Sequence, residues 1–257
     1  MILTIDVGNT DTVFAFYDND QLIENFRGIT KPYKSLQEYI NLLEGFKGKI
    51  PSKITGIIAA TVVPDLKKAL YESCIEVFNV KPIFVGDDDV KIDLKVKIDK
   101  PHTIGADRVA NAIGALKKYQ KNIIIADFGT ATTFEIVGKD RNYLGGVIAP
   151  GIATSVKSLH ESAALLPMYK VERPGRVVAT SLEDALHSGI FYGSLGMINF
   201  LIENIKKELK GDFKVISTGG LGGLFTQHTK AIDVYEPHLT TSGLLEIYRF
   251  NKRKNDI

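Results

Sequence analysis

The sequence has little cysteine, little net charge and no long apolar run. Cys74 is the only cysteine among 257 residues, so no intrachain disulfide can form and a reducing compartment suits the chain. The formal net charge is +2, from 32 basic and 30 acidic side chains, which does not favour nucleic acid as a partner. The N-terminus lacks the basic region of a signal peptide, and no apolar run approaches the roughly 20 residues of a membrane span. These absences predict a cytoplasmic protein with no nucleic-acid or membrane partner.

What the chain does contain is an ordinary globular composition, 44% hydrophobic and 24% charged, which excludes a disordered or fibrous protein. Apolar spacing predicts strands and helices mixed in an α/β order. Ser35 is expected to cap the first helix, and Pro64 to lie in the first turn of the second. The predicted helices cover residues 36–46, 64–78, 106–118, 152–163, 181–191, 195–210 and 244–250. The basic run at 252–254 is then expected to be a solvated tail.

An internal repeat is the most informative feature of the sequence. The segment Ile2–Thr10 parallels Ile123–Ala131, nearly half the chain further on, and each reads as strand, Asp-x-Gly-polar turn, strand. The repeat predicts two similar α/β halves with mixed sheets, residues 1–104 and 105–257. Ligands commonly bind between such halves, so we expect a cleft there.

The repeated turns have the chemistry of phosphate binding. In Asp6–Thr10 an acidic residue ends a strand, Gly8 allows a tight turn, and Asn9 and Thr10 supply polar donors. Backbone amides and hydroxyls can cradle phosphate oxygens, and a strand-end carboxylate can hold Mg²⁺ through water. A plain β-hairpin with an Asp/Gly/Asn turn explains one such segment equally well. The second copy, Asp127–Thr133, favours the functional interpretation. Gly219–Gly223 could let the backbone approach a flat ring or ribose closely, although a glycine-rich helix entry explains this run equally well.

These elements, in this order, resemble the sugar kinase, actin and Hsp70 superfamily. The finer resemblance is to type III pantothenate kinases, also called the Bvg accessory factor family. The matching segments, spread over essentially the whole chain, are Asp6–Thr10, Thr61–Pro64, Gly105–Arg108, Asp127–Thr132, Gly145–Gly151 and Thr218–Gly220. The resemblance implies a duplicated actin-like (ribonuclease H-like) fold and ATP-dependent phosphorylation of pantothenate, the first step toward coenzyme A. It also implies Mg²⁺, a monovalent cation such as K⁺ or NH₄⁺, and a homodimer whose interface lies in the second half.

The resemblance also assigns roles to individual residues. It places the general base on Asp107, the clamp for the substrate carboxylate on Arg108 and the monovalent-cation ligand on Asp127. Phosphoryl transfer needs positioning, charge neutralisation and a base for the hydroxyl, and a carboxylate at a helix N-terminus stays ionised. Without the surrounding motifs, the favoured interpretation of Asp107 and Arg108 is a helix-start Asp with a solvated Arg neighbour. The expected ATP and phosphate contacts are Asp6, Val7, Gly8, Asn9, Thr10, Asp11, Thr12, Val13, Thr130, Gly219 and Gly220, and the expected substrate contacts are Ile98, Gly105, Ala106, Asp107, Arg108 and Leu182.

Two of the substrate positions depart from the family pattern. Ile98 stands where the family usually has a Tyr, and Leu182 where it places a Thr contributed across the dimer, although Thr180 and Ser181 are adjacent. Lost hydroxyl contacts typically cost about 0.5–1.5 kcal/mol each. The departures leave open a kinase of another small carboxylate-bearing alcohol, such as pantoate, or a non-catalytic ATP-binding regulator. A phosphatase is disfavoured because Gly8 occupies the place of its second Asp, and a hydrolase of nucleotides or polyphosphate would use Asp107 to activate water.

Overall fold

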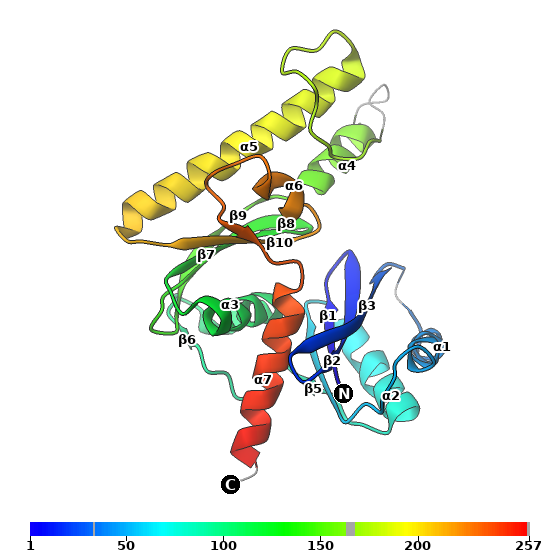
Figure 1. The fold of residues 1–257 in the computed structure, drawn as a ribbon. Coiled ribbons are helices and arrows are strands. Elements are labelled where there is room, and N and C mark those ends of the chain that lie inside the picture. The colour runs from blue at the N-terminus through cyan, green and yellow to red at the C-terminus, as the bar shows by residue number, and fades with distance from the viewer. Residues whose placement is uncertain (33, 163–167, 256–257) are drawn as a thin grey trace. The chain divides into compact units, whose positions relative to one another are not determined.

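The computed structural model describes residues 1–32, 34–162 and 168–255 (Figure 1). The chain forms two compact units, one of Met1–Lys118 with His238–Ile257 and the other of Tyr119–Pro237. The two units are described separately below.

The first unit contains a five-stranded sheet with helices on both faces. Its strands follow the order β3-β2-β1-β4-β5, with β1 antiparallel to β2 and parallel to β4. The elements are β1 (Ile2–Val7), β2 (Asp11–Asp18), β3 (Gln21–Ile29), α1 (Leu36–Lys47), β4 (Gly56–Thr61), η1 (Pro64–Leu66), α2 (Lys67–Phe78), β5 (Ile83–Phe84), β6 (Lys95–Val96), η2 (Pro101–Thr103), α3 (Ala106–Tyr119) and α7 (Leu239–Asn255). Ser35 caps α1 in a capping box with Glu38, as predicted.

The alternation of side chains along β4 explains why both faces of this sheet are covered. Ile57 and Ala59 point into a core with α1 and α2, whereas Ile58 and Ala60 point into a core with α3 and α7. A strand buried on both faces is apolar throughout, as the sequence of β4 is. The sheet therefore holds α3 and α7 together on one face.

The second unit repeats the same topology. Its strands β7 (Ile123–Phe128), β8 (Ala131–Val137), β9 (Asn142–Pro150), β10 (Lys214–Gly219) and β11 (Val234–Tyr235) follow the order β9-β8-β7-β10-β11. Strand β7 is antiparallel to β8 and parallel to β10, as β1 is to β2 and β4. The helices are α4 (Ile152–Ser162), α5 (Leu182–Leu209) and α6 (Gly222–Thr226). The predicted duplicated α/β fold with mixed sheets is thus confirmed, while the cleft between the halves stays a prediction.

Three expectations from the sequence differ from the structure. The helices predicted at 181–191 and 195–210 form one helix, α5, of 28 residues. The last helix begins at Leu239 and continues to Asn255, so the basic residues at 252–254 lie on α7 instead of in a tail. Residue 163, the predicted end of α4, lies outside the described residues. The boundary between the two units also differs from the predicted one at residue 104. Helices α3 and α7 both belong to the first unit, because Val109 and Ile113 of α3 pack in one core with Leu244 of α7.

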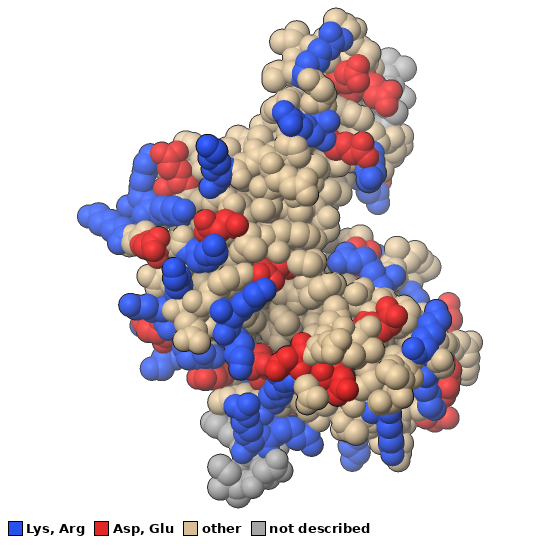
Figure 2. Space-filling view, viewed as in Figure 1, with Lys and Arg blue, Asp and Glu red and all other residues tan. Residues whose placement is uncertain are grey.

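Helix α5 corrects the expectation about apolar runs. By length and composition alone this helix could cross a membrane. Only 22% of its most apolar stretch of 18 residues is buried. A single helix of this kind is weak evidence for a membrane span, because helices of other proteins meet the same criterion. Figure 2 shows that charged side chains gather toward the ends of α5 and leave the surface over its middle uncharged.

Candidate functional site

The turn between β1 and β2 is tightly fixed by backbone hydrogen bonds. The Gly8 amide donates to the Asp11 carbonyl oxygen at 2.9 Å, and a β-carbon on Gly8 would stand 3.1 Å from that oxygen. Asn9 and Thr10 are exposed at the tip, whereas Asp6 is half-buried at the end of β1. The turn therefore presents polar groups on a rigid base, as a phosphate-binding loop requires.

Thr30, which the motif analysis missed, holds this turn from the side of β3. Its amide donates to the Thr10 carbonyl oxygen at 2.7 Å, and its hydroxyl donates to the Gly8 carbonyl oxygen at 2.8 Å. The Thr12 hydroxyl lies 3.0 Å from that of Thr30. Thr30 is buried and follows the end of β3, so its role depends on strand pairing that no local motif reveals.

The start of α3 lies beside the end of β1 through Val62. The Val62 amide donates to the Val7 carbonyl oxygen at 3.1 Å, and Val62 Cγ1 is 3.8 Å from where a β-carbon on Gly105 would stand. The same β-carbon would collide with Asp107 Oδ1. Glycine at 105 thus leaves room for the Asp107 carboxylate, and the first unit brings the β1 turn and Asp107 to one region.

Asp107 and Arg108 occupy the first turn of α3, with side chains that are half-buried. Asp107 Oδ1 accepts a hydrogen bond of 2.9 Å from the Arg108 amide. A carboxylate in this position is favoured in its ionised form by the positive end of the helix dipole. Within the described part of the chain, no carboxylate pairs with the Arg108 guanidinium, which can therefore receive a carboxylate from a ligand.

The second unit has a matching turn between β7 and β8. The Gly129 amide donates to the Ala131 carbonyl oxygen at 3.0 Å, the counterpart of the bond between Gly8 and Asp11. The Thr154 hydroxyl donates to the Thr130 carbonyl oxygen at 2.7 Å. A β-carbon on Gly151 would collide with that same carbonyl, so α4 begins in contact with the turn. Thr154, like Thr30, was not recognisable from the sequence motifs.

Gly219 brings the end of β10 against Asp127. The two strands are parallel, with Thr218 opposite Asp127 and Gly219 opposite Phe128. Gly219 has a φ of +81°, a conformation that favours glycine, and its missing β-carbon would stand 2.6 Å from both Asp127 Oδ1 and the Phe128 carbonyl oxygen. Two oxygens therefore converge on a space that only glycine leaves open.

The later glycines of the Gly219–Gly223 run lie at the entry to helix α6, which begins at Gly222. The flat ring that they approach belongs to the protein itself: β-carbons on Gly222 and Gly223 would stand 2.8 Å and 3.1 Å from ring atoms of Tyr235. The Tyr235 hydroxyl donates to the Gly219 carbonyl oxygen at 3.2 Å. Tyr235 thus packs against the glycine loop and is hydrogen-bonded to it. Gly219 and Gly220 remain the candidates for contact with a nucleotide.

The donor set can be compared with the needs of the expected cations. Among the described residues, no three His, Cys, Asp or Glu side chains form a group that could hold a metal ion. Mg²⁺ in kinases usually needs only one or two carboxylates and the phosphates of the nucleotide, so a single strand-end carboxylate such as Asp6 fits it. For the monovalent cation, the Asp127 carboxylate beside Gly219 is the candidate oxygen ligand.

The two departing substrate positions lie in different units. Ile98 is half-buried in the bend before η2, and Leu182 is 57% exposed as the first residue of α5. The neighbouring hydroxyls already have partners: Ser181 caps α5 by accepting from the Asp184 amide at 3.1 Å, and Thr180 accepts from Arg176 at 2.7 Å. The Thr180 hydroxyl can still donate to a ligand, whereas the Ser181 hydroxyl also donates to Asp184 Oδ2 at 2.8 Å and would have to break that hydrogen bond.

Comparison with known proteins gives the same family along the whole chain. Residues 2–204 match the family model described as type III pantothenate kinase. The chain is 42% identical to the type III pantothenate kinase of Paramagnetospirillum magneticum over 254 residues, which is 98% of each chain. It is 39% identical to that of Geobacillus kaustophilus over 257 residues, 99% of each. Among solved structures, a Campylobacter jejuni protein assigned to the Baf family of transcriptional activators has a TM-score of 0.60 at 20% identity, over 98% of this chain and 99% of that one, which shows a shared fold.

Proposed function

Because the chain belongs to the type III pantothenate kinase family, we propose that the groups described above carry out its reaction, with Asp107 as the general base. The reaction is the ATP-dependent phosphorylation of pantothenate, the first step of coenzyme A biosynthesis. The observation that carries the assignment of the base is the position of Asp107 in the first turn of α3, beside the β1 turn and next to an Arg108 that pairs with no carboxylate in the described chain.

The residues of the first unit provide most of the required groups. The turn from Asp6 to Val13 receives the phosphates of ATP, with Asn9 and Thr10 as exposed donors and Asp6 as the group that holds Mg²⁺ through water. Bound there, the ion neutralises charge on the phosphates. Arg108 clamps the carboxylate of pantothenate, and Gly105 and Ala106 line the substrate beside it. Asp107 accepts the proton of the attacking hydroxyl, which strengthens that oxygen as a nucleophile.

The second unit supplies the remaining contacts. Thr130 binds phosphate on the β7 turn, and Gly219 and Gly220 lie against the adenosine part of the nucleotide. Asp127, together with neighbouring backbone carbonyl oxygens, holds K⁺ or NH₄⁺. A protein of this function is expected in the cytoplasm.

We further propose that the enzyme is a homodimer formed through α5. Residues 182, 185, 189, 193, 196 and 200 are all exposed and recur at helical spacing, so they share one face of the helix. This face has glycines at 189, 193 and 196, none of which has another atom within 4 Å of its missing β-carbon, and it ends at Phe200, which is 64% exposed. Small residues let two helices approach closely. Leu182 lies on the same face and would be presented to the partner.

A coupled assay of ADP release tests the proposed function. Purified protein with ATP, Mg²⁺ and K⁺ is measured with pantothenate, with pantoate and with no acceptor, and the product is identified by mass spectrometry. We expect ADP release that depends on pantothenate, with formation of phosphopantothenate. Release that is stimulated only by pantoate, or is the same without an acceptor, would contradict the proposal.

A further inference from the structure

Two adjacent threonines at the start of α7 connect the two parts of the site in the first unit. The Thr240 hydroxyl donates to Asn111 Oδ1 of α3 at 2.7 Å. The Thr241 hydroxyl lies 2.9 Å from the hydroxyl of Tyr17, at the end of β2 that lies away from the turn. Helix α3 carries Asp107, and β2 is one strand of the hairpin that forms the β1 turn. One dipeptide of α7 therefore holds the helix of the proposed base and the strand of the phosphate turn.

Burial makes these hydrogen bonds costly to lose. Asn111 is fully buried, and Tyr17 and Thr241 are each only 3% exposed. The Thr241 hydroxyl donates to the His238 carbonyl oxygen at 3.1 Å, and since it has a single proton it accepts from Tyr17. Burial raises the pKa of Tyr17, so its hydroxyl keeps the proton that it donates. A buried polar group that loses its partner is penalised by its full desolvation.

The backbones of α3 and α7 approach so closely that the helices have little freedom to slide. A β-carbon on Gly114 would stand 2.8 Å from the Leu239 carbonyl oxygen and 3.1 Å from the Gly243 amide nitrogen. A β-carbon on Gly243 would collide with the Ala110 carbonyl. Asn111 lies four residues after Asp107, so the two side chains share one face of α3 a single turn apart. A displacement at Asn111 is therefore passed to Asp107.

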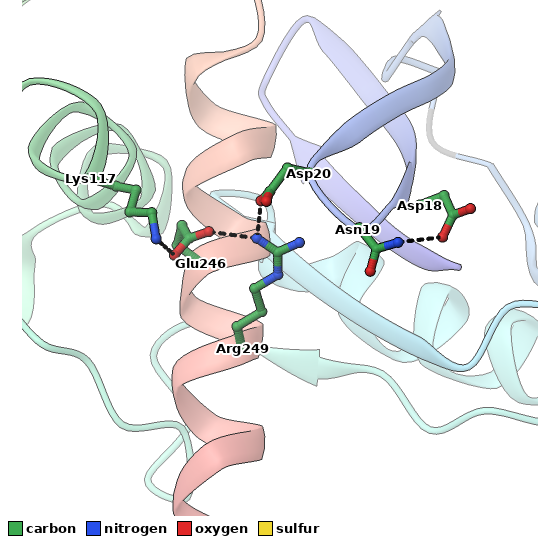
Figure 3. A network of polar contacts seen from close by, with 6 residues as sticks. All are labelled: Asp18, Asn19, Asp20, Lys117, Glu246 and Arg249. Carbon is green, nitrogen blue, oxygen red and sulfur yellow. Dashed lines mark hydrogen bonds and ion pairs between the residues drawn. The ribbon is translucent and has the colours of Figure 1, made fainter.

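A second connection between the same elements lies at the surface (Figure 3). Glu246 pairs with Lys117 of α3 at 3.3 Å and with Arg249 at 2.8 Å, and Arg249 pairs with Asp20 in the turn after β2. Side chains of Lys117 and Asp20 are 60% and 86% exposed. Ion pairs with such exposed members contribute little to stability. This outer network has the same connectivity as the threonine pair but is less buried: the side chains of Glu246 and Arg249 are 17% and 24% exposed, whereas Tyr17 and Thr241 are each 3% exposed.

We infer that Thr240 and Thr241 are positioning residues for the reaction: they fix the first turn of α3, and with it Asp107, relative to the phosphate turn of β1 and β2. The inference rests on the proposed role of Asp107. The threonines touch neither substrate nor nucleotide, and they act through Asn111 and Tyr17. The outer network serves as the natural comparison, because it joins the same three elements.

The test compares Thr240→Val, Thr240→Ser and Tyr17→Phe with Glu246→Gln and Asp20→Asn. Misplacement of a catalytic group by about 1 Å can cost a factor of about 100, so we expect kcat to fall about 10- to 100-fold in Thr240→Val and Tyr17→Phe. The Kd for ATP should change little, and Thr240→Ser should restore most of kcat. The outer variants should keep kcat near that of the original protein. Equal losses of kcat in Thr240→Val and Thr240→Ser, or an unchanged kcat in Thr240→Val with unchanged order at the start of α3, would overturn the inference.

A second measurement keeps this test separate from the assignment of the base. Amide hydrogen exchange at Arg108, Val109 and Ala110 reports the order of the first turn of α3 whether or not Asp107 is the base. We expect faster exchange there in Thr240→Val and not in Glu246→Gln. If exchange rises but kcat is unchanged, the role proposed for Asp107 is wrong; if exchange is unchanged, the positioning role of Thr240 is wrong.

Discussion

A β-carbon on Gly219 would stand 2.6 Å from Asp127 Oδ1, so the end of β10 packs directly against the Asp127 carboxylate near the end of β7. The Phe128 carbonyl oxygen lies at the same distance from that point. The left-handed φ of Gly219 and the absence of a side chain together create this arrangement of oxygens. A side chain at position 219 would collide with both oxygens, so this close packing requires glycine.

Replacing Gly219 by alanine should therefore damage both the fold and the site. The alanine would carry strain of about 1–3 kcal/mol at a positive φ, and its β-carbon would enter the space between the two oxygens. We expect a lower midpoint of urea unfolding and a large loss of kcat/KM. Gly86→Ala is the matched control, because Gly86 also has a positive φ, +102°, but nothing lies within 4 Å of its missing β-carbon. Equal effects of the two substitutions would argue against a special role for Gly219.

The oxygens beside Gly219 also lead to a prediction about salts. If Asp127 and neighbouring backbone carbonyl oxygens bind a monovalent cation, turnover should be high in K⁺ or NH₄⁺ and fall to a small fraction in Na⁺ at equal ionic strength. Asp127→Asn should weaken the response by raising the K⁺ concentration needed for half-maximal activity. The measurement is a K⁺ titration of initial rates at saturating ATP. Full activity in strictly Na⁺ buffer would rule out the cation role.

Much of the fold could be predicted from the sequence because its signals are local. The Asp-x-Gly turns mark both hairpins, and the order β3-β2-β1-β4-β5 recurs as β9-β8-β7-β10-β11. The sequence predicts two helices in place of α5, with a gap at residues 192–194 that contains Gly193. The structure leaves open space around Gly193, so this residue continues the helix and, with Gly189 and Gly196, exposes a narrow face.

The rest of the candidate site depends on contacts between distant segments. Thr30 closes the β1 turn from another strand, and Thr240 reaches Asn111 across 129 positions of sequence. A threonine at the start of a helix has many explanations, and none of them points to one buried asparagine. The assignment of α7 to the first unit is equally non-local, since it follows from the packing of Leu244 against Ile58 and Val109.

Asp107→Asn tests the base most directly. The amide keeps the size of the side chain but cannot accept the proton of the substrate hydroxyl, so we expect kcat to fall at least about 100-fold. Binding of ATP should be retained, because the phosphate turn is untouched, and isothermal titration with ATP checks this. Arg108→Lys is the companion variant: it keeps the charge but loses the planar fork, so KM for pantothenate should rise while Kd for ATP stays the same. Turnover near the original level in Asp107→Asn would refute the assignment.

Cys74 gives a prediction about pH and stability. Burial raises the pKa of its thiol to about 12, compared with about 8.5 in an unfolded chain. The thiol therefore stays protonated in the folded state, and its contribution to stability is complete below about pH 8.5 and is lost as the pH rises toward 12. Relative to Cys74→Ala, the original protein should lose about 2 kcal/mol of unfolding free energy between pH 7 and pH 10. Urea unfolding of both proteins at pH 7 and pH 10 measures this loss. Between pH 6 and pH 7 we expect no loss relative to Cys74→Ala.

The proposed dimer interface on the exposed face of α5 is tested by adding a large side chain to that face. Gly193→Leu places a large side chain where two helices are proposed to meet, so light scattering should show the mass of a monomer in place of a dimer. Gly45→Leu on α1 is the matched control, since Gly45 is also an exposed helical glycine with open space around it, and both substitutions improve helix propensity. If Leu182 faces the partner's substrate, KM for pantothenate should also rise in the monomer. A dimer that persists in Gly193→Leu would exclude this face, whereas recovery of the original protein only in detergent would favour a membrane as its partner.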